Sequence, residues 1–393
     1  MKRNLLFITT IWLFFIFAFS SLVFVDESSA VPAFARKYRM SCTTCHTPFP
    51  KLKPYGDDFA GNGFELEDQD APRYMVETGD EKLDLIRDLP LAIRMEGYLQ
   101  YQTQTDKDVD YSTPYYLKFI SGGKVTDGFA YYFYFYLSEH GEVAGIEDAY
   151  VMFNNLFDSE LDIYFGQFQV SDPLFKRELR LTYEDYPVYT VSPGKSQISL
   201  KYDRGFMITY GFETGTDLIF ETVNGNGLVE ADDFGVFDDD KYKSFAGRIS
   251  QDIGEYFRVG GFGYYGKEGT EDINNEVYYY GPDMSIAYAP LELNVQYLER
   301  SDSDPNLVDY DGDEIETRGA MAELIYLPDG EFSEFYAVGL FNWIESDFEE
   351  LEYRSLTGHV GHVFRSNLRF FVEYTYEMAS EEARVVTGCV GPF

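Results

Sequence analysis

Two cysteines and a histidine lie within five residues of one another, in the run Cys42-Thr43-Thr44-Cys45-His46. Thiols spaced by two residues can add to the two vinyl groups of a haem, and a histidine that follows them directly is held near the iron. The run therefore predicts one covalently bound haem c, attached through Cys42 and Cys45, with His46 as an axial ligand of the iron. The sequence indicates no separate catalytic residue.

Other interpretations of this run fit less well. A thioredoxin-like redox pair needs a βαβ setting that the sequence lacks. A zinc site needs four ligands, and the only other cysteine, Cys389, is far away in the sequence. A disulfide between Cys42 and Cys45 leaves His46 without a role.

The ligand on the second side of the iron is left open. Met75 and Met95 are the candidate sulfur ligands, and a water molecule is an alternative. Met40 lies only six residues from His46, which makes the opposite face of the iron hard to reach. The remaining histidines fall in predicted strands or at their ends: His140, His359 and His362.

The first thirty residues predict a cleaved signal peptide. Lys2 and Arg3 precede an apolar run at 5–25, and small residues at 28–30 offer a cleavage point before Val31. The run is also long enough to act as an uncleaved membrane anchor. In either case the chain is exported, so its cysteines must be interpreted for an oxidising compartment.

The composition favours a membrane barrel over other all-β folds. The chain has 34 Tyr and 35 Phe but only two Trp, and its mean hydropathy is -0.28. No apolar run after Val25 is long enough for a membrane helix. Outer-membrane barrels use many aromatic residues at both membrane interfaces while their lumen stays polar.

Residues 91–102 alternate apolar and polar side chains with a period of two, which predicts a strand with one wet face. One face carries Leu91, Ile93, Met95, Leu99 and Tyr101, and the other carries Arg94, Glu96, Gln100 and Gln102. Similar segments lie near 113–121, 128–138, 144–154, 160–169, 205–213, 215–224, 243–252, 255–266, 276–288, 291–300, 316–327, 333–344, 352–364, 367–378 and 383–393.

The connections between these segments differ in kind. Those at 289–290 and 365–367 are tight, whereas those at 225–242 and 301–315 are long and acidic. Bacterial barrels have short turns at one end and long loops at the other, and the final Phe393 resembles their terminal assembly signal. We therefore predict an all-β fold: a transmembrane antiparallel β-barrel of about 16 strands in residues 89–393. A soluble sandwich or solenoid is the alternative.

Residues 31–88 are too few to bury a haem and also to build a core of their own. The barrel interior is the natural cover, so this region is predicted to be a small N-terminal c-type haem plug or a cap at the barrel mouth. The fold then has three parts: a signal peptide at 1–30, a monohaem cytochrome c plug at 31–88 and the barrel at 89–393.

The net charge is -37, with 68 acidic against 31 basic residues. A field of this sign repels nucleic acid and attracts cations. Residues 170–204 interrupt the strand pattern after Gly166-Gln167-Phe168, a run that resembles the start of the inward loop of some porins. An exposed loop is the alternative for this segment.

The N-terminal region resembles the fused monohaem cytochrome–porins of the outer membrane, a family that includes the iron-oxidase cytochromes of iron-oxidising bacteria. The likeness covers about thirty residues, and the rest of the chain is similar only in layout. The shared runs are Pro32-Ala33-Phe34-Ala35-Arg36, Met40-Ser41-Cys42, Cys45-His46, Phe49-Pro50-Lys51-Leu52, Pro54-Tyr55-Gly56 and Asn62-Gly63.

The resemblance implies a haem plug in a barrel of about sixteen strands that moves electrons across the outer membrane. Cys42 and Cys45 would hold the haem, and His46 would be its proximal ligand. The implied partners are an extracellular redox donor or metal ion such as Fe(II), a periplasmic c-type cytochrome or other acceptor, and outer-membrane lipid. The alternatives are a selective porin with a structural or sensory haem plug, and a peroxidase-like enzyme.

Overall fold

The computed structural model describes residues 33–66, 75–76, 78–103, 109–308 and 314–393, so the predicted signal peptide lies outside the described residues. The strands are β1 (Leu91–Gln102), β2 (Val109–Thr126), β3 (Phe129–Glu139), β4 (Gly145–Phe153), β5 (Leu161–Gln169), β6 (Tyr202–Gly211), β7 (Thr216–Val223), β8 (Ser244–Ile253), β9 (Phe257–Gly269), β10 (Asn274–Tyr288), β11 (Leu291–Asp302), β12 (Ile315–Tyr326), β13 (Phe335–Ser346), β14 (Tyr353–Arg365), β15 (Leu368–Glu377) and β16 (Glu382–Pro392). The helices are α2 (Ala33–Tyr38), α3 (Pro54–Gly61), η2 (Cys42–Thr44), η3 (Leu156–Asp158), η4 (Arg177–Leu179), η5 (Pro187–Tyr189), η6 (Gly330–Phe332) and η7 (Glu349–Leu351).

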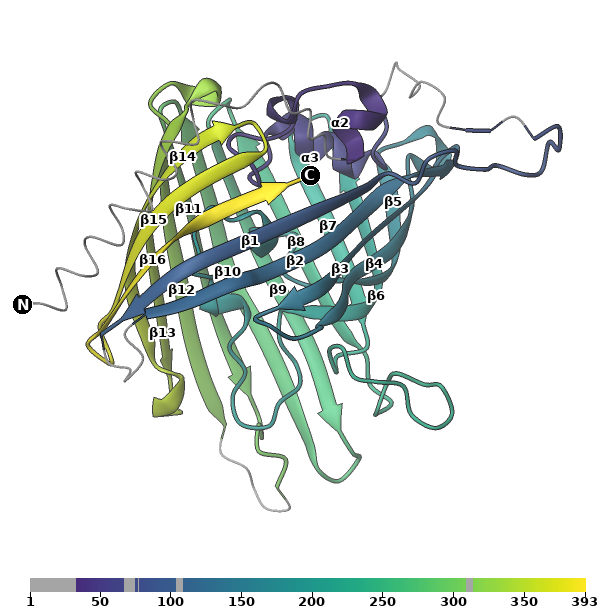
Figure 1. Cartoon of the computed structure of the whole chain (residues 1–393). Coiled ribbons are helices and arrows are strands. Elements are labelled where there is room, and N and C mark those ends of the chain that lie inside the picture. Colours follow the sequence, from purple (N-terminus) through teal and green to yellow (C-terminus); the bar gives the residue numbers. More distant parts are fainter. Residues whose placement is uncertain (1–32, 67–74, 77, 104–108, 309–313) are drawn as a thin grey trace, which may run out of the picture. The chain divides into compact units, whose positions relative to one another are not determined.

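The strands close into one antiparallel barrel (Figure 1). Each strand pairs with its neighbours in the sequence, and β1 closes the ring by pairing with β16, where Arg94 lies opposite Pro392. Two further backbone hydrogen bonds join Phe393 to Ile93, so the last residue extends this seam. All sixteen predicted segments correspond to strands, with ends shifted by a few residues, and the predicted barrel is confirmed.

Side-chain alternation gives the barrel a polar inner face and an apolar outer face. On β1 the polar face buries Arg94, Glu96 and Gln100 in the lumen, while Met95 on the outer face is 40% exposed. Strand side chains alternate between the two faces, so a polar inner face leaves an apolar outer face. Large apolar residues on the outer faces of other strands include Phe165, Phe220, Ile249, Leu324 and Leu356.

The connections alternate in length around the ring. At one end the strands are joined by short links such as 127–128, 289–290 and 366–367. At the other end they include the long links 170–201 and 224–243. We call the end with the short links the plug end, because residues 33–66 lie there, and the end with the long links the far end. This difference in loop length is the one seen in bacterial outer-membrane barrels.

Residues 33–66, here called the plug, sit at the plug end. Arg36 donates a hydrogen bond to the backbone oxygen of Leu91, at the start of β1, and Asn154 donates one to that of Gly61. Figure 1 shows α2 and α3 at this end of the barrel. Within the described residues no helix is both long enough and apolar enough to cross a membrane.

Residues 170–201, here called the inward segment, join β5 to β6 through the lumen. Val170, Leu181, Tyr189 and Leu200 are all almost fully buried. A segment that followed the outer surface would leave such side chains in contact with solvent. Of the two alternatives that the sequence left open, the structure shows the inward fold and not an exposed loop.

Candidate functional site

The Cys-x-x-Cys-His run forms a single tight turn. The backbone oxygen of Cys42 accepts hydrogen bonds from the backbone N–H groups of Cys45, at 3.2 Å, and His46, at 2.9 Å. Ser41 caps the turn by accepting a hydrogen bond from the backbone N–H of Thr43. The turn thus brings both thiols and the imidazole together, and both thiols are free.

His46 is held in one orientation. Its Nδ1 donates a hydrogen bond of 3.0 Å to the backbone oxygen of Pro50, and its ring packs edge-on against Phe49 at 5.0 Å between centroids. Burial lowers the pKa of His46 to about 4, so the ring is neutral near pH 7. A neutral imidazole whose Nδ1 is occupied leaves Nε2 as the nitrogen for a metal.

Helix α3 supports the turn from behind. The backbone N–H of Lys53 donates to the oxygen of Cys45 at 2.8 Å, and Pro54 begins the helix. Gly56 then passes so close that an added Cβ would clash with the Cys45 carbonyl oxygen and would touch Leu52 at 3.0 Å. Glycine is required at this position because no side chain fits between the helix and the turn.

An apolar bed joins the turn to the barrel wall. Tyr38, Phe59 and Phe64 of the plug form one buried cluster with Met152 of β4, and Cys45 packs against it. The edge-on contact between Phe59 and Tyr38 spans 5.6 Å between centroids. The cluster anchors the cysteine-bearing turn to the inside of the barrel.

Ion pairs fix the rim of the plug to the plug end of the barrel. Lys51 pairs with Glu292 at 2.9 Å, and Lys53 pairs with Glu331 at 2.7 Å. Their partners lie on opposite sides of β12, in β11 and in η6. A third pair, of Glu65 with Lys124, spans 3.1 Å. The plug is thus tied to both sides of the ring.

A cavity of about 1130 Å³ lies between the plug and the inward segment. This cavity begins beside the turn formed by residues 42–46, because Leu52, which lines the cavity, pairs with His46 in a short backbone bridge. Apolar lining comes also from Leu66, Phe175 and Leu181. Cofactor sites commonly occupy about 300–1000 Å³. This cavity is slightly larger than that range, and its lining is mostly charged and polar and does not include the two cysteines or the histidine of the turn. The fit to a covalently attached haem therefore rests on the two free thiols and the imidazole, and the cavity supplies space beside them.

The inward segment fills the lumen beyond this cavity. Its residues Val188, Tyr189 and Ile198 form a large buried cluster with barrel residues such as Met321 and Leu340. The lumen therefore carries an apolar core across much of its width, whereas a water-filled pore has polar walls.

Arg300 is the main polar anchor of the inward segment. This side chain, 1% exposed, donates to the backbone oxygens of Val191 at 3.2 Å and of Ile198 at 2.8 Å. It also pairs with Asp302 at 2.5 Å. On another wall, the carboxylate of Glu373 accepts hydrogen bonds from the backbone of the segment.

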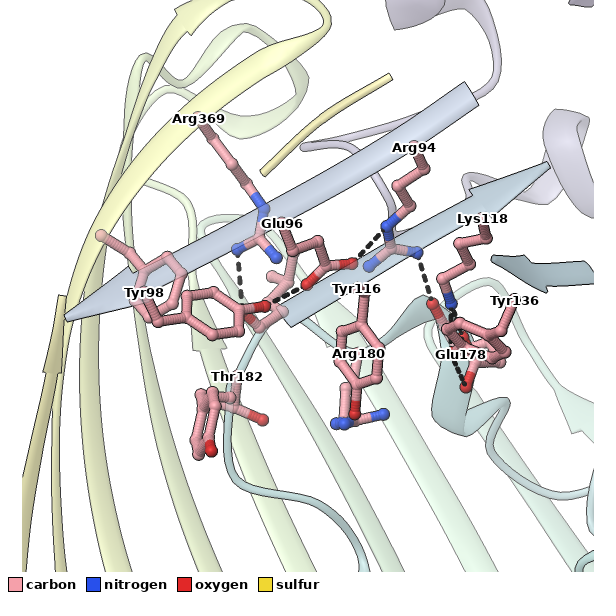
Figure 2. Close-up of a pocket in the computed structure, with 13 residues that line it drawn as sticks. Arg94, Glu96, Tyr98, Tyr116, Lys118, Tyr136, Glu178, Arg180, Thr182 and Arg369 are labelled. Atoms are coloured by element: carbon pink, nitrogen blue, oxygen red, sulfur yellow. Dashed lines mark hydrogen bonds and ion pairs between the residues drawn. The ribbon is translucent and has the colours of Figure 1, made fainter. Parts of the chain in front are cut away.

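A second, small cavity of about 20 Å³ has a strongly charged lining (Figure 2). Arg94 donates to the backbone oxygen of Glu178 at 3.1 Å and pairs with Glu96 at 2.6 Å, and Lys118 pairs with the Glu178 carboxylate. Arg369 donates to the backbone oxygen of Leu181. Four basic side chains, with Arg180 as the fourth, thus face two carboxylates in a protein of strongly negative charge.

The sequence placed Arg94 and Glu96 on the polar face of the first strand, but it did not predict that they join Lys118, Arg180 and Arg369 in one charged cluster. Arg94, Lys118 and Arg369 all occupy lumen-facing positions of strands, which the alternation would have identified. Buried basic residues in an acidic chain are unusual enough to single out. One residue of this cluster lies close to the Cys-x-x-Cys-His turn, because the guanidinium carbon of Arg94 is 5.5 Å from the ring centroid of Phe49.

The two predicted sulfur ligands are not brought to the motif together. Met95 points outward from β1, away from the lumen. Met75 pairs with Ile86 in a short antiparallel bridge. Met40 and Met152, by contrast, pack in or against the cluster that contacts Cys45. The identity of the second axial ligand stays a prediction.

The remaining histidines have other surroundings. His359 is buried in the lumen, with Nδ1 bonded to Glu373 and Nε2 to the hydroxyl of Tyr336. His140 lies at the far end, and the ring of His362 lies 4.4 Å from that of Phe335 in a tilted contact. Within the described residues, no group of three or more His, Cys, Asp or Glu side chains is arranged to hold a metal ion.

No protein-family profile matches the sequence, and no curated protein is similar to it. Solved structures with a similar fold include an anion-selective porin from Comamonas acidovorans, with a TM-score of 0.56, 10% identity and coverage of 77% of this chain and 98% of the other. A loop-deletion mutant of OmpT, an outer membrane protein of Vibrio cholerae, has a TM-score of 0.56, 11% identity and coverage of 77% and 98%. The outer membrane channel DcaP of Acinetobacter baumannii has a TM-score of 0.54, 14% identity and coverage of 78% and 97%. This chain therefore has a porin-like fold.

Proposed function

We propose that this chain is an outer-membrane electron-transfer protein that carries one covalent haem c within a porin-like barrel. The observation that carries the proposal is the turn in which two free thiols and a neutral imidazole, Cys42, Cys45 and His46, meet beside a cavity. The likeness of the N-terminal region to the fused monohaem cytochrome–porins supports it, and we propose membership of that family. When bound, the haem supplies a one-electron Fe(III)/Fe(II) couple.

Each residue of the turn has its own task in this proposal. Cys42 and Cys45 bind the macrocycle through thioether bonds. His46 ligates the iron through Nε2, because Pro50 holds its Nδ1. The outward direction of Met95 leaves Met75, or a water molecule, for the second axial position.

The inward segment favours a conduit over an open channel. Its apolar core occupies the lumen beyond the plug, and Arg300 and Glu373 fasten it to two walls. A packed interior of this kind restricts the passage of water and ions through the lumen beyond the plug.

The two ends of the barrel then face different partners. Short turns of outer-membrane barrels lie on the periplasmic side, so the plug end would meet a periplasmic c-type cytochrome or another electron acceptor. The far end would meet the donor, and a net charge of -37 attracts cations such as Fe(II) to it. With Fe(II) as donor, the activity is that of an Fe(II):cytochrome c oxidoreductase. Lipid surrounds the apolar outer face.

The test uses the full protein, matured in a host that attaches haem c and reconstituted in liposomes that enclose an oxidised redox dye. Addition of Fe(II) outside should reduce the dye, and the double variant Cys42→Ser/Cys45→Ser, which has no thiol left for a thioether bond, should abolish both the covalent haem and the dye reduction. Cys389→Ser is the matched control and should change neither. A wild-type protein that binds no covalent haem would overturn the proposal.

A selective porin with a structural or sensory haem plug is the second candidate, and the porin-like fold favours it. It predicts ion or solute conductance through the barrel, and any dye reduction by Fe(II) that enters through the channel should persist in the variant that lacks the haem. Conductance measured on the same liposome preparations separates the two functions.

A further inference from the structure

We infer that a column of aromatic side chains in mutual contact along β2 and β3, most of them edge-on or tilted to one another, forms the electronic path between the plug and the far end of the barrel. This inference rests on the proposed electron-transfer function and names the route that such a function would use. The aromatic column consists, in spatial order, of Phe64, Tyr132, Tyr134, Tyr136, Tyr116 and Tyr115.

The column begins at the plug. Phe64 belongs to the buried cluster against which Cys45 packs. Its ring stacks on that of Tyr132 at 5.4 Å between centroids, with 22° between the ring planes. Because Cys45 would be bonded to the macrocycle, the first ring of the column, which lies in the cluster that Cys45 contacts, would be close to the cofactor.

The column then follows the barrel wall without a gap. The centroid of Tyr134 lies 6.4 Å from that of Tyr132 and 5.7 Å from that of Tyr136. These three tyrosines are two residues apart on β3, so the strand period directs them all to the lumen. Tyr136 contacts Tyr116 of β2 at 5.3 Å, and Tyr116 contacts Tyr115 at 4.8 Å.

The column ends at a cavity of about 740 Å³ at the far end. Tyr115 and His140 both line this cavity, and their rings lie 4.5 Å apart. Tyr116 pairs with Glu139, seven residues beyond Tyr132 on β3. At roughly 3.3 Å per residue, the column therefore spans about 23 Å of wall, most of the way between the two ends of the barrel.

The rings act as a packed bridge and do not change oxidation state. The ammonium group of Lys118 lies 4.5 Å from the ring centroid of Tyr136 and 5.1 Å from that of Tyr134 (Figure 2 shows Lys118 beside Tyr136). Lys118 is paired with the carboxylate of Glu178, so little net charge lies beside these rings, and the step assigns no oxidised state to a tyrosine. One electron leaves a one-electron donor such as Fe(II) in the far cavity, which is oxidised to Fe(III), and it reduces one ferric haem iron to ferrous.

Lumen filling alone would not require this arrangement. Across the barrel, the inner faces of β11 to β13 fill the lumen with aliphatic side chains such as Leu298, Met321 and Leu340. Tyr264 and Tyr279 form a separate ring contact on β9 and β10, at 5.6 Å.

The run of six rings follows β2 and β3 from the plug to the far cavity. A second aromatic link reaches the same cavity. Phe49, beside His46, packs against the cluster of Tyr98. The ring of Tyr98 contacts that of Tyr115 at 4.9 Å.

The experiment injects an electron at the far cavity of the holoprotein. A ruthenium photosensitiser is attached to the thiol introduced by Asp110→Cys, at a position that lines that cavity. Cys389→Ala removes the thiol of Cys389, which the sensitiser could otherwise label. Flash excitation reduces the ferric haem, and transient absorption measures the rate. The absorption spectrum before the flash reports the covalent haem, so its absence would contradict the proposed function and remove the basis of this inference.

Tyr134→Leu should slow haem reduction several-fold, whereas Tyr134→Phe, which keeps the ring, should keep the wild-type rate. Tyr264→Leu is the matched control, because Tyr264 is 4% exposed and Tyr134 is 3% exposed. Tyr132→Leu carries the same expectation as Tyr134→Leu, should the latter fail to fold. Equal rates in all variants with full haem content, or equal slowing by Tyr264→Leu, would overturn the inference.

Discussion

The imidazole of His46 and the backbone carbonyl of Pro50 are joined by a hydrogen bond of 3.0 Å, in which Nδ1–H donates to the carbonyl oxygen. The bond selects one tautomer of the neutral ring and leaves the lone pair on Nε2. A metal-ligating histidine is commonly oriented in this way by a backbone carbonyl. The orientation is therefore built into the plug before any iron is bound.

Replacing His46 by alanine tests this assignment. In holoprotein that carries the variant, the spectrum of the reduced haem should lose its histidine-ligated form, because the iron has lost an axial nitrogen. Added imidazole should restore the spectrum by entering the space of the missing ring. His362→Ala is the control, since that ring lies on Phe335 in the barrel wall. An unchanged spectrum in His46→Ala would exclude this histidine as the ligand.

Gly56→Ala should loosen the haem-motif turn. The added methyl group would collide with the Cys45 carbonyl oxygen, and overpacking of this kind typically costs about 1–3 kcal/mol. Gly61→Ala in the same helix is the control, because its Cβ would meet no atom within 4 Å. Haem content per protein and protease resistance of the plug should fall for Gly56→Ala and hold for Gly61→Ala. Equal behaviour would contradict a close helix–turn contact.

The barrel was predictable because its information is local. A period of two, repeated between turn signals, identifies each strand and its inner face, as in residues 91–102. Antiparallel strands joined in sequence then pair with their neighbours. The course of the inward segment was harder to predict, since contacts such as that of Arg300 with Ile198 join residues far apart in the sequence.

The part of the candidate site that lies within one turn was also predictable from the sequence. Cys42, Cys45 and His46 share one turn, so their spacing alone places them together. The cavity beside them and the aromatic column depend on which strands meet in the closed ring, and single-sequence patterns do not carry that register. The inner-face tyrosines at 132, 134 and 136 were visible as an alternation, but their link to Phe64 was not.

Arg300→Leu should release the inward segment. The variant leaves Asp302 buried without its partner, and breaking a buried ion pair in this way typically costs about 3–5 kcal/mol. Arg318→Leu is the matched control, because its pair with Glu316 is exposed and such pairs contribute about 0–1 kcal/mol. We expect lower thermal stability and higher ion conductance for Arg300→Leu alone. Unchanged conductance together with lowered stability would mean that the segment stays in the lumen without this anchor.

The ionisation of Asp172, which lines the cavity below the plug, should make the stability of the fold depend on pH. Burial raises the pKa of Asp172 from 3.8 to about 6, against the opposing effect of Lys176. Below about pH 3 the carboxyl group is largely protonated in both the folded and the unfolded chain, so it imposes almost no penalty. As the pH rises towards 6, the unfolded chain ionises first and the folded state loses stability. Above pH 6 the penalty is complete and amounts to at most about 3 kcal/mol.

Asp172→Asn removes this ionisation. The variant should therefore unfold at a higher temperature than the wild type at pH 7, and the difference should shrink as the pH falls from 7 to 4. Thermal unfolding in detergent, followed by circular dichroism at several pH values, measures it. Asp158→Asn, in an exposed turn at the plug end, is the control and should leave the profile unchanged. A difference that persists at pH 4 would show that the introduced amide stabilises the fold through a new hydrogen bond, because at that pH the aspartate carries a proton in the folded state and no buried charge remains to be removed.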